Sequence, residues 1–410
     1  MAAGIYIHIP FCVRKCLYCD FVSGIRSMEN MQRYQNALLN EIESTVINET
    51  VDSVFFGGGT PSVYPVEYIE EIMKLLYKKF NIVKNILDKT YTDRDYMNNN
   101  GITNNPCEIT IECNPGTLDM DKLYRYRKSG INRLSMGLQS SDNDELKTLG
   151  RIHTYEEFEQ SFIMARKTGF TNINIDIMSA IPNQSLASYK STLEKLVRLN
   201  PEHISAYSLI IEEGTVFYSK YSEGKECESD LPDEDTDREM YHFTKNFLSE
   251  NGYGRYEISN YAKKGMECKH NLKYWSRDNY YGFGISAASL VDNVRYTNIS
   301  DIDKYMNIME NASSNEGVVS HEIKTHIRET QEKIDIYGQM EEFMFLGLRK
   351  IKGISIKEFK NVFGREIYSV YGNVLDKMCE NELMEYTGEY YRLSDKGIDV
   401  SNVVLAEFLL

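Results

Sequence analysis

The first half of the chain alternates between short strand-like segments and longer segments with helical periodicity, which favours one class of fold. The strand candidates are Gly4–Pro10, Ser53–Phe56, Glu108–Glu112, Arg133–Gly137, Asn172–Met178 and His203–Leu209. The helical candidates between them are Met31–Ile47, Glu67–Lys79, Met120–Lys128, Tyr155–Lys167 and Leu186–Leu199. This order predicts an α/β fold on a parallel sheet with right-handed crossovers. Periodicity leaves open whether the sheet is doubly wound or a curved partial barrel.

Changes in pattern along the chain predict three parts. Residues 1–215 carry the alternating segments, with a surface insertion at 81–106 that is rich in Asn and Asp. Residues 216–325 form a mixed region with an acidic loop and a Tyr- and Gly-rich stretch. Residues 326–410 contain short helices and a hairpin turning at Thr387–Glu389, which predicts a small, mostly helical, winged-helix-like domain.

The net charge and the positions of the cysteines restrict which partners and which cellular compartment are expected. Asp and Glu outnumber Lys and Arg by 61 to 46, and the resulting net charge of -15 disfavours nucleic acid as a partner. No run of about 18 apolar residues occurs, so we expect no integral membrane segment. Three of the eight cysteines crowd together, which favours a metal site in a reducing compartment over a disulfide framework. We therefore expect a cytoplasmic protein.

Three cysteines directly after the first predicted strand form the most specific motif. Cys12, Cys16 and Cys19 have the spacing C-x3-C-x2-C. Thiolates suit soft metals and iron–sulfur clusters, and three of them can hold three irons of a 4Fe–4S cube. The fourth iron then stays open to a small molecule. The alternative is a structural zinc site completed by His8 or Asp20.

Glycines and polar residues at the ends of later strands predict a ligand site near these cysteines. The second strand ends in GGGTP, residues 57–61, where glycines let the backbone approach a ligand closely. In parallel α/β folds the site is built at the carboxyl ends of the strands. Further candidates at such ends are Glu112, Gln139, Ser140, Arg151 and Asp176.

Together these motifs resemble the radical S-adenosylmethionine superfamily. The segments YIHIPFC, GGGTP, IECNPGTL, RLSMGLQS, LGRIHT, IDIMSAIP and HISAYSL run in the order of oxygen-independent coproporphyrinogen III oxidase and its HemW-like relatives. The resemblance implies a partial (β/α)6 TIM-type barrel, a 4Fe–4S cluster on the three cysteines, and bound S-adenosylmethionine. By resemblance, the residues that would contact S-adenosylmethionine are Tyr6, Gly58, Gly59, Thr60, Glu112, Gln139, Arg151 and Asp176.

Two features favour the heme-chaperone branch of this family over the oxidase branch. The oxidase carries a further cysteine at the position of Phe21. The segment CKHNLKYW, residues 268–275, resembles the HNxxYW motif of the HemW-like branch. Histidine is a common heme ligand, and Tyr and Trp can stack on a porphyrin face. The heme candidates are His270, Asn271, Tyr274 and Trp275.

Several functional alternatives stay open at this point. The resemblance implies a protein that binds heme and delivers it to apo-hemoproteins. One alternative is radical decarboxylation of porphyrinogen propionates, as in the oxidase branch. Another is a cluster-bearing scaffold that docks partners through its C-terminal domain. The alternative for His270 is a hydrogen-bonded side chain that fixes the adjoining loop.

Overall fold

The computed structural model describes residues 2–83, 106–314 and 326–410. Nearly all of the predicted insertion at 81–106 therefore lies outside the described residues. Six parallel strands form the centre of the molecule and follow one another across the sheet in chain order. They are β1 (Ala3–Ile9), β2 (Val51–Gly58), β3 (Glu108–Cys113), β4 (Arg133–Gln139), β5 (Ile173–Ser179) and β6 (His203–Ser208).

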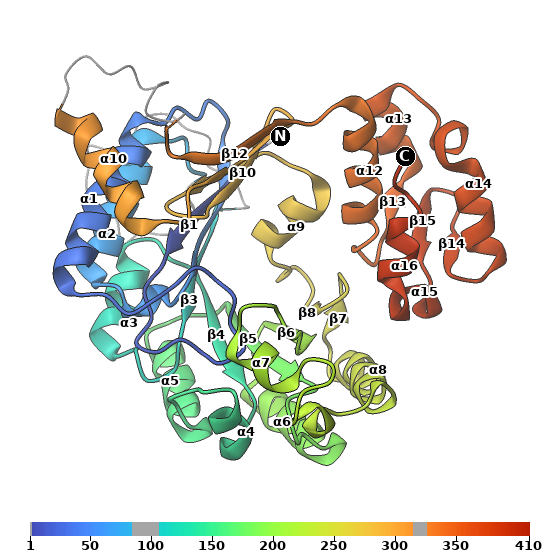
Figure 1. Ribbon diagram of the computed structural model, residues 1–410, viewed down its shortest axis with the longest axis horizontal. Helices are drawn as coiled ribbons and strands as arrows, with labels where there is room; N and C mark the ends of the chain where they lie inside the picture. Colours follow the sequence, from blue (N-terminus) through green and yellow to red (C-terminus); the bar gives the residue numbers. More distant parts are fainter. Residues whose placement is uncertain (1, 84–105, 315–325) are drawn as a thin grey trace.

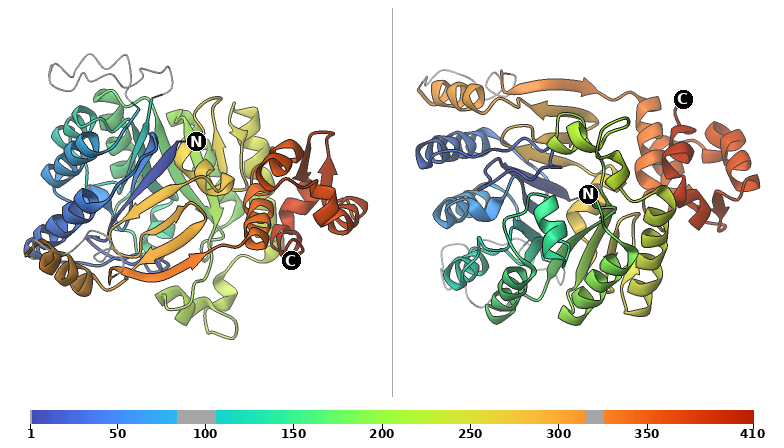
Figure 2. Two further views of the ribbon diagram at one scale, coloured as in Figure 1. Left: turned by 90° about the horizontal axis from the view of Figure 1, so that it is seen from above. Right: turned by 60° about the horizontal axis from the view of Figure 1, so that its bottom comes forward.

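The helices that connect these strands cover the outer face of the sheet (Figures 1 and 2). They are α1 (Met28–Ser44), α2 (Val66–Lys79), α3 (Met120–Lys128), α4 (Asn143–Thr148), α5 (Tyr155–Lys167) and α6 (Leu186–Leu199). Because the strand order equals the chain order, every right-handed crossover moves in the same direction and places its helix on the same face. The sheet is therefore singly wound, which confirms the partial-barrel prediction over a doubly wound sheet.

The side chains of β1 show how the two faces of the sheet differ. Ile5, Ile7 and Ile9 are fully buried in the main hydrophobic core beneath the outer helices. Tyr6 and His8 alternate with them and lie on the concave face, where the Tyr6 hydroxyl is 3.1 Å from His8 Nδ1. The concave face thus carries polar and aromatic side chains that can line a ligand site.

Shorter strands extend the sheet at both edges. Next to β1 come β9 (Tyr280–Phe283), β10 (Ala288–Val291), β11 (Val294–Asn298) and β12 (Arg328–Lys333). Beyond β6 come β8 (Asn260–Ala262) and β7 (Gly254–Arg255). Strand β9 runs parallel to β1, whereas the other added strands pair antiparallel with their neighbours. In the described part of the chain, β12 and β7 are the two edges of one open sheet.

Four helices accompany these added strands: α7 (Val216–Tyr221), α8 (Glu234–Glu250), α9 (Lys269–Ser276) and α10 (Ile302–Ser314). Helix α9 lies against the amino-terminal ends of β1 and β2, opposite the ends where the predicted cysteine loop begins (Figure 1). Lys273 fixes it there, because its Nζ donates to the carbonyl of Ala2 at 2.7 Å and pairs with Asp52 at 2.7 Å. Helix α9 therefore covers one end of the partial barrel.

The C-terminal part has its own hydrophobic core, built around Met340, Phe359, Leu375 and Phe408. Its elements are α12 (Ile336–Gly347), β13 (Ile354–Ser355), α13 (Ile356–Phe363), α14 (Ile367–Glu380), β14 (Met384–Tyr386), β15 (Tyr390–Leu393), α15 (Asp395–Asp399) and α16 (Ser401–Ala406). Helices beside a small three-stranded sheet confirm the mostly helical, winged-helix-like prediction, including the hairpin.

Two further observations concern the predicted organisation. Strand β12 falls within the predicted C-terminal part, 326–410, but pairs with β11 in the large sheet. The boundaries of the three parts stay predictions. None of the helices in the described ranges has the length and apolar character needed to cross a lipid bilayer.

Candidate functional site

The three motif cysteines lie in the loop between β1 and α1, at the carboxyl end of the parallel sheet. The Cys12 amide donates to the Gly24 carbonyl at 3.1 Å, which closes the base of the loop. The Leu17 amide donates to the Leu149 carbonyl at 3.1 Å and fastens the middle of the loop to the end of α4. Cys12 is almost fully buried, whereas Cys16 and Cys19 are partly exposed. The loop presents the thiols of Cys12 and Cys16 towards the strand ends, where Thr60 and Arg151 contact them.

The thiol groups influence one another and contact two hydrogen-bond donors. Burial raises the pKa of the Cys19 thiol to about 11, and the neighbouring Cys16 and Cys12 add to this rise. Arg151 Nη1 lies 3.5 Å from the Cys16 sulfur, and the Thr60 hydroxyl lies 3.5 Å from the Cys12 sulfur. Donors at these positions stabilise thiolates, the form that binds metal.

An all-sulfur donor set fits an iron–sulfur cube. Within the described ranges, no group of three Cys, His, Asp or Glu side chains converges on a point that a single ion would fill. In a cube each thiolate binds a different iron, so its ligands do not need to converge on one point. His8, the alternative zinc ligand, has both ring nitrogens in hydrogen bonds, with Tyr6 and with the Val22 carbonyl at 2.9 Å.

The glycines at the end of β2 make room for the cysteine loop. The Gly59 amide donates to the Ile9 carbonyl at 2.9 Å. A Cβ atom on Gly59 would lie 2.8 Å from the Phe11 carbonyl oxygen and 3.0 Å from the Cys12 sulfur. Gly58 has φ +113°, and a Cβ there would lie 2.7 Å from the His8 ring. The glycine run thus positions the loop as well as exposing backbone groups to a ligand.

Two partly buried carboxyl groups lie on the same face of the sheet below this edge, Glu112 on β3 and Asp176 on β5, with β4 between them. Burial, and then the charge of Asp176, raise the pKa of Glu112 to about 8, although Gly58 donates a backbone hydrogen bond to it. Burial also raises the pKa of Asp176, which accepts hydrogen bonds from Asn174 at 2.7 Å and Ser135 at 3.3 Å. Because both groups are costly to ionise alone, the pair suits a cationic ligand.

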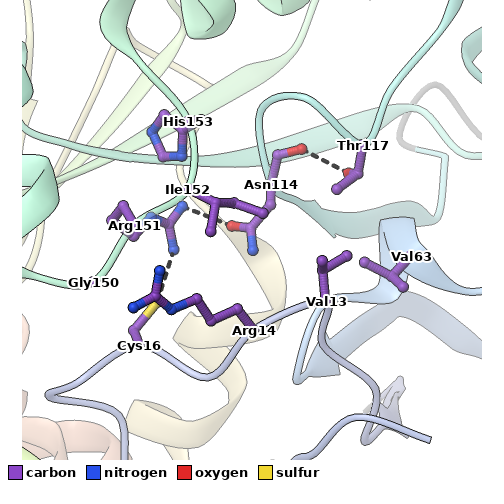
Figure 3. A pocket seen from close by; sticks show the side chains of 10 residues that line it. All are labelled: Val13, Arg14, Cys16, Val63, Asn114, Thr117, Gly150, Arg151, Ile152 and His153. Atoms are coloured by element: carbon purple, nitrogen blue, oxygen red, sulfur yellow. Dashed lines mark hydrogen bonds between the residues drawn. The ribbon is translucent and has the colours of Figure 1, made fainter.

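Arg151 and Gln139 complete the rim of the site. Arg151 Nη2 donates to the Gly137 carbonyl at 2.6 Å and to Asn114 Oδ1 at 2.7 Å, as Figure 3 shows for Asn114. Gln139 has φ +71° at the irregular end of β4, and its Oε1 accepts from the Tyr207 hydroxyl at 3.0 Å. These contacts hold both side chains beside the cysteine loop.

Sequence reasoning missed Asn114, which joins two of the predicted residues. Its Nδ2 donates to the Thr60 hydroxyl at 2.9 Å while its Oδ1 accepts from Arg151. Thr60 and Arg151 in turn donate to Cys12 and Cys16. Asn114 directly follows β3, so its place at a strand end was the available signal.

The HNxxYW residues lie on α9, at the end of the barrel opposite the cysteine loop. His270 is 1% exposed; its Nδ1 lies 3.0 Å from the Ser53 hydroxyl and its Nε2 lies 2.8 Å from the Tyr274 hydroxyl. Burial lowers the pKa of His270 to about 3. Asn271 is partly buried beside it, and Trp275 packs under Arg349, whose guanidinium is 4.4 Å from the ring centre. The predicted residues therefore form two groups, and these meet where the His270 ring stacks on Tyr6 with centres 6.4 Å apart.

Comparisons with known proteins agree with this architecture. A family model described as the radical SAM superfamily matches residues 6–196, and one described as the HemN C-terminal domain matches residues 338–400. A Lactococcus lactis protein named heme chaperone HemW is 32% identical over 99% of this chain and 97% of its own length. Its Bacillus subtilis namesake is 33% identical over 98% of both chains. This chain belongs to the HemW family of radical SAM proteins.

A solved structure supports the fold of this HemW-family chain. Coproporphyrinogen III oxidase (HemN) from Escherichia coli, described as a radical SAM enzyme, superposes with a TM-score of 0.79 at 20% identity. The match covers 100% of this chain and 90% of the other. Membership of the radical SAM superfamily implies a 4Fe–4S cluster and S-adenosylmethionine. Which residues hold them stays a prediction from the geometry described above.

Proposed function

We propose that this HemW-family protein is a heme chaperone that binds heme and delivers it to apo-hemoproteins in the cytoplasm. The observation that carries the proposal is the full-length match to two proteins named heme chaperones, which includes the cysteine loop and the HNxxYW helix. The carboxyl end of the sheet would hold a 4Fe–4S cluster and S-adenosylmethionine, and the HNxxYW end would serve heme.

Each part of the cluster loop has a role in this proposal. Cys12, Cys16 and Cys19 would hold three irons. Thr60 and Arg151 would donate hydrogen bonds to the first two sulfurs, because both donors already lie 3.5 Å from them. Such donors stabilise the anionic cluster and tune its potential. When bound, the cluster and S-adenosylmethionine would supply one-electron chemistry.

The residues around the loop would hold S-adenosylmethionine, which carries an ammonium group, a carboxylate and a sulfonium centre. The two partly buried carboxyl groups, Glu112 and Asp176, would face its positive charge. Arg151 would face its carboxylate. Backbone groups at Gly58–Thr60, together with Tyr6 and Gln139, would complete the contacts. Binding of a cation would restore the ionised form of Glu112, whose pKa is about 8 without ligand.

The test is an anaerobic heme-binding and transfer assay on protein whose cluster has been rebuilt. Hemin is titrated in and followed by its Soret band, and apomyoglobin is then added as a generic acceptor, with and without S-adenosylmethionine. We expect stoichiometric binding, and transfer faster than from a noncarrier such as serum albumin. Absence of a stoichiometric Soret band would contradict the chaperone proposal and favour the scaffold alternative.

The same preparation tests the decarboxylase alternative from the sequence. Coproporphyrinogen III, S-adenosylmethionine and a reductant are incubated with the rebuilt protein under nitrogen, and the products are separated by chromatography. We expect no protoporphyrinogen. Its formation at a catalytic rate would overturn the chaperone proposal in favour of oxidase chemistry.

A further inference from the structure

A second pocket lies at the amino-terminal end of the barrel, remote from the cysteine loop. Its volume is about 310 Å³, at the lower end of the range for small-molecule sites. It lies between α9, the strands β9 to β11 and helix α12 of the C-terminal part. Its lining residues are Tyr274, Trp275, Tyr280, Leu290, Arg295, Phe345 and Leu346.

The walls of this pocket, which we call the α9–α12 pocket, are aromatic and apolar. The Tyr274 and Tyr280 rings meet edge to face with centres 4.6 Å apart. Trp275 is partly exposed, and its indole nitrogen has no hydrogen-bond partner among the described residues. Packing, including the stacked Arg349, therefore holds the indole in place. Aromatic rings offer flat apolar faces on which a planar ligand can stack.

The one charged side chain among the described residues that line the pocket is Arg295. Glu342 on α12 accepts from Arg277 at 2.6 Å and from Arg295 at 2.5 Å, so one carboxylate serves two guanidinium groups. Arg277 is buried, but the Arg295 side chain keeps 37% of its surface exposed. Arg295 can therefore donate hydrogen bonds to a second carboxylate, from a ligand outside the protein, while Glu342 stays paired with Arg277.

His270 lies behind this pocket and does not line it. Both of its ring nitrogens are engaged, one by Ser53 and the other by Tyr274. The ring also stacks on Phe55, with centres 5.3 Å apart. These contacts fix the Tyr274 ring that forms one wall of the pocket. The histidine of the HNxxYW motif thus has the geometry of a positioning residue, and Tyr274 and Trp275 have the geometry of ligand-facing ones.

We propose that the α9–α12 pocket takes the edge of a porphyrin, with its ring against Trp275 and Tyr274 and a propionate on Arg295. His270 positions Tyr274 and does not ligate the iron. This inference rests on the proposed heme binding and goes further, because it assigns recognition to the ring and a carboxylate. It also makes the C-terminal part, through Phe345 and Leu346, one wall of the site.

The test uses metal-free protoporphyrin IX, which has the ring and both propionates but no iron. Trp275 is the chain's single tryptophan, so quenching of its fluorescence reports porphyrin binding to the full-length protein. We expect saturable quenching with wild type. Arg295→Gln should weaken binding about fivefold or more, the size of one lost charge-assisted hydrogen bond. The dimethyl ester of protoporphyrin, which lacks free carboxylates, should bind both proteins equally.

Matched variants separate the pocket from general surface effects. Arg328→Gln is the control for charge, because Arg328 lies on the edge strand β12 and stacks on Tyr296 outside the pocket. Leu346→Phe fills the pocket with the same kind of apolar side chain and should weaken protoporphyrin binding. Thermal melts of all variants check that they fold. Ser53→Ala removes the partner of His270 Nδ1 but keeps the histidine, so it perturbs the same contact less than His270→Gln does.

The role of His270 has a readout of its own. If it positions Tyr274, His270→Gln and Ser53→Ala weaken protoporphyrin and hemin binding alike, and the Soret maximum of bound hemin stays where it is. A shifted Soret maximum in His270→Gln with unchanged protoporphyrin affinity would overturn this role. If Arg295→Gln and Leu346→Phe both bind protoporphyrin as tightly as wild type, and hemin binding is normal, the proposed pocket is wrong but the proposed chaperone function stands. Failure of wild type to bind hemin would remove both.

Discussion

Arg151 Nη1 lies 3.5 Å from the sulfur of Cys16, although 135 residues separate them in the chain. The arginine reaches the cysteine loop because α4 returns the chain to the carboxyl end of the sheet, where the Leu149 carbonyl also binds the Leu17 amide. Two strand-end loops are thereby joined around the candidate cluster site. Arg151 links the cysteine loop to Asn114 and Gly137 at the same time.

Replacing Arg151 should weaken cluster retention. Arg151→Gln removes the donor to Cys16 and leaves Asn114 Oδ1 and the Gly137 carbonyl without their partner. Because loss of an outer donor commonly costs about tenfold or more in metal affinity, we expect faster loss of iron to a chelator. Absorbance near the cluster band and iron content after anaerobic reconstitution measure this. Arg33→Gln, which breaks a surface pair with Glu310, should retain iron like wild type.

Adding one methyl group at Gly59 should displace the cysteine loop. A Cβ there would lie 2.8 Å from the Phe11 carbonyl and 3.0 Å from the Cys12 sulfur, and neither atom belongs to the far end of a flexible side chain. We expect Gly59→Ala to fold but to bind less iron. Gly24→Ala is the matched control in the same loop, because a Cβ at Gly24 meets nothing within 4 Å. Equal iron content in both variants would contradict the prediction.

The raised pKa of the Glu112 carboxyl group predicts a pH dependence of stability in protein free of S-adenosylmethionine. Its pKa of about 8 lies above the ordinary value of 4.5, so the folded state holds this proton more tightly than the unfolded state. The stability that this group contributes is complete below pH 4.5 and is lost as the pH rises towards 8. Asp176, whose pKa is also raised, acts in the same direction.

The side chain of the Glu112→Gln variant stays neutral at every pH. The variant should therefore not show the part of the stability loss with rising pH that Glu112 causes. Between pH 6 and pH 8.5 we expect the variant to gain on the order of 1–3 kcal/mol relative to wild type. Denaturant unfolding at the two pH values measures the difference. Glu385→Gln, on an exposed strand, should follow wild type at both. A variant with the same pH slope as wild type would show that Glu112 is already ionised in the empty site.

Breaking the shared carboxylate at the α9–α12 pocket should destabilise the contact between α12 and the large sheet. Glu342→Gln leaves the buried Arg277, 7% exposed, without a charge partner. Removing one member of a buried ion pair costs about 3–5 kcal/mol, whereas breaking the exposed Arg392–Glu385 pair costs about 1 kcal/mol or less. Urea unfolding of Glu342→Gln beside Glu385→Gln measures both. Equal midpoints would mean that water already solvates Arg277.

Much of the fold could be predicted, because the local periodicity of apolar residues indicates where helices and strands lie. The bounds of α3, α5 and α6 match the predicted helices at both ends, and all six central strands were identified. The added strands β7 to β12 were not predicted. Most of them are short, and the five exposed residues that end β12 give no alternation of apolar side chains. Their pairing depends on the edges that β1 and β6 already offer.

Some residues of the candidate site could likewise be predicted from the sequence, whereas others became apparent only from the fold. Spacing alone pointed to Cys12, Cys16 and Cys19, since a motif within eight residues needs no knowledge of distant contacts. The contacts of Asn114 and the placement of Glu112 and Asp176 on one face of the sheet appeared only in three dimensions, because they depend on the register of β3, β4 and β5. His270 is the sharpest case. The motif suggested a heme ligand, and the fold gave both of its nitrogens protein partners.

The sequence by itself therefore determined the strand and helix order, the sulfur ligands and the family resemblance. These follow from side chains close together along the chain. Only the tertiary structure decided that the sheet is singly wound and curved, and that the HNxxYW helix covers the barrel end opposite the cysteines. It also formed the α9–α12 pocket between segments some 70 residues apart, such as Trp275 and Phe345. Such contacts arise only when the core packs, because that packing decides which distant surfaces meet.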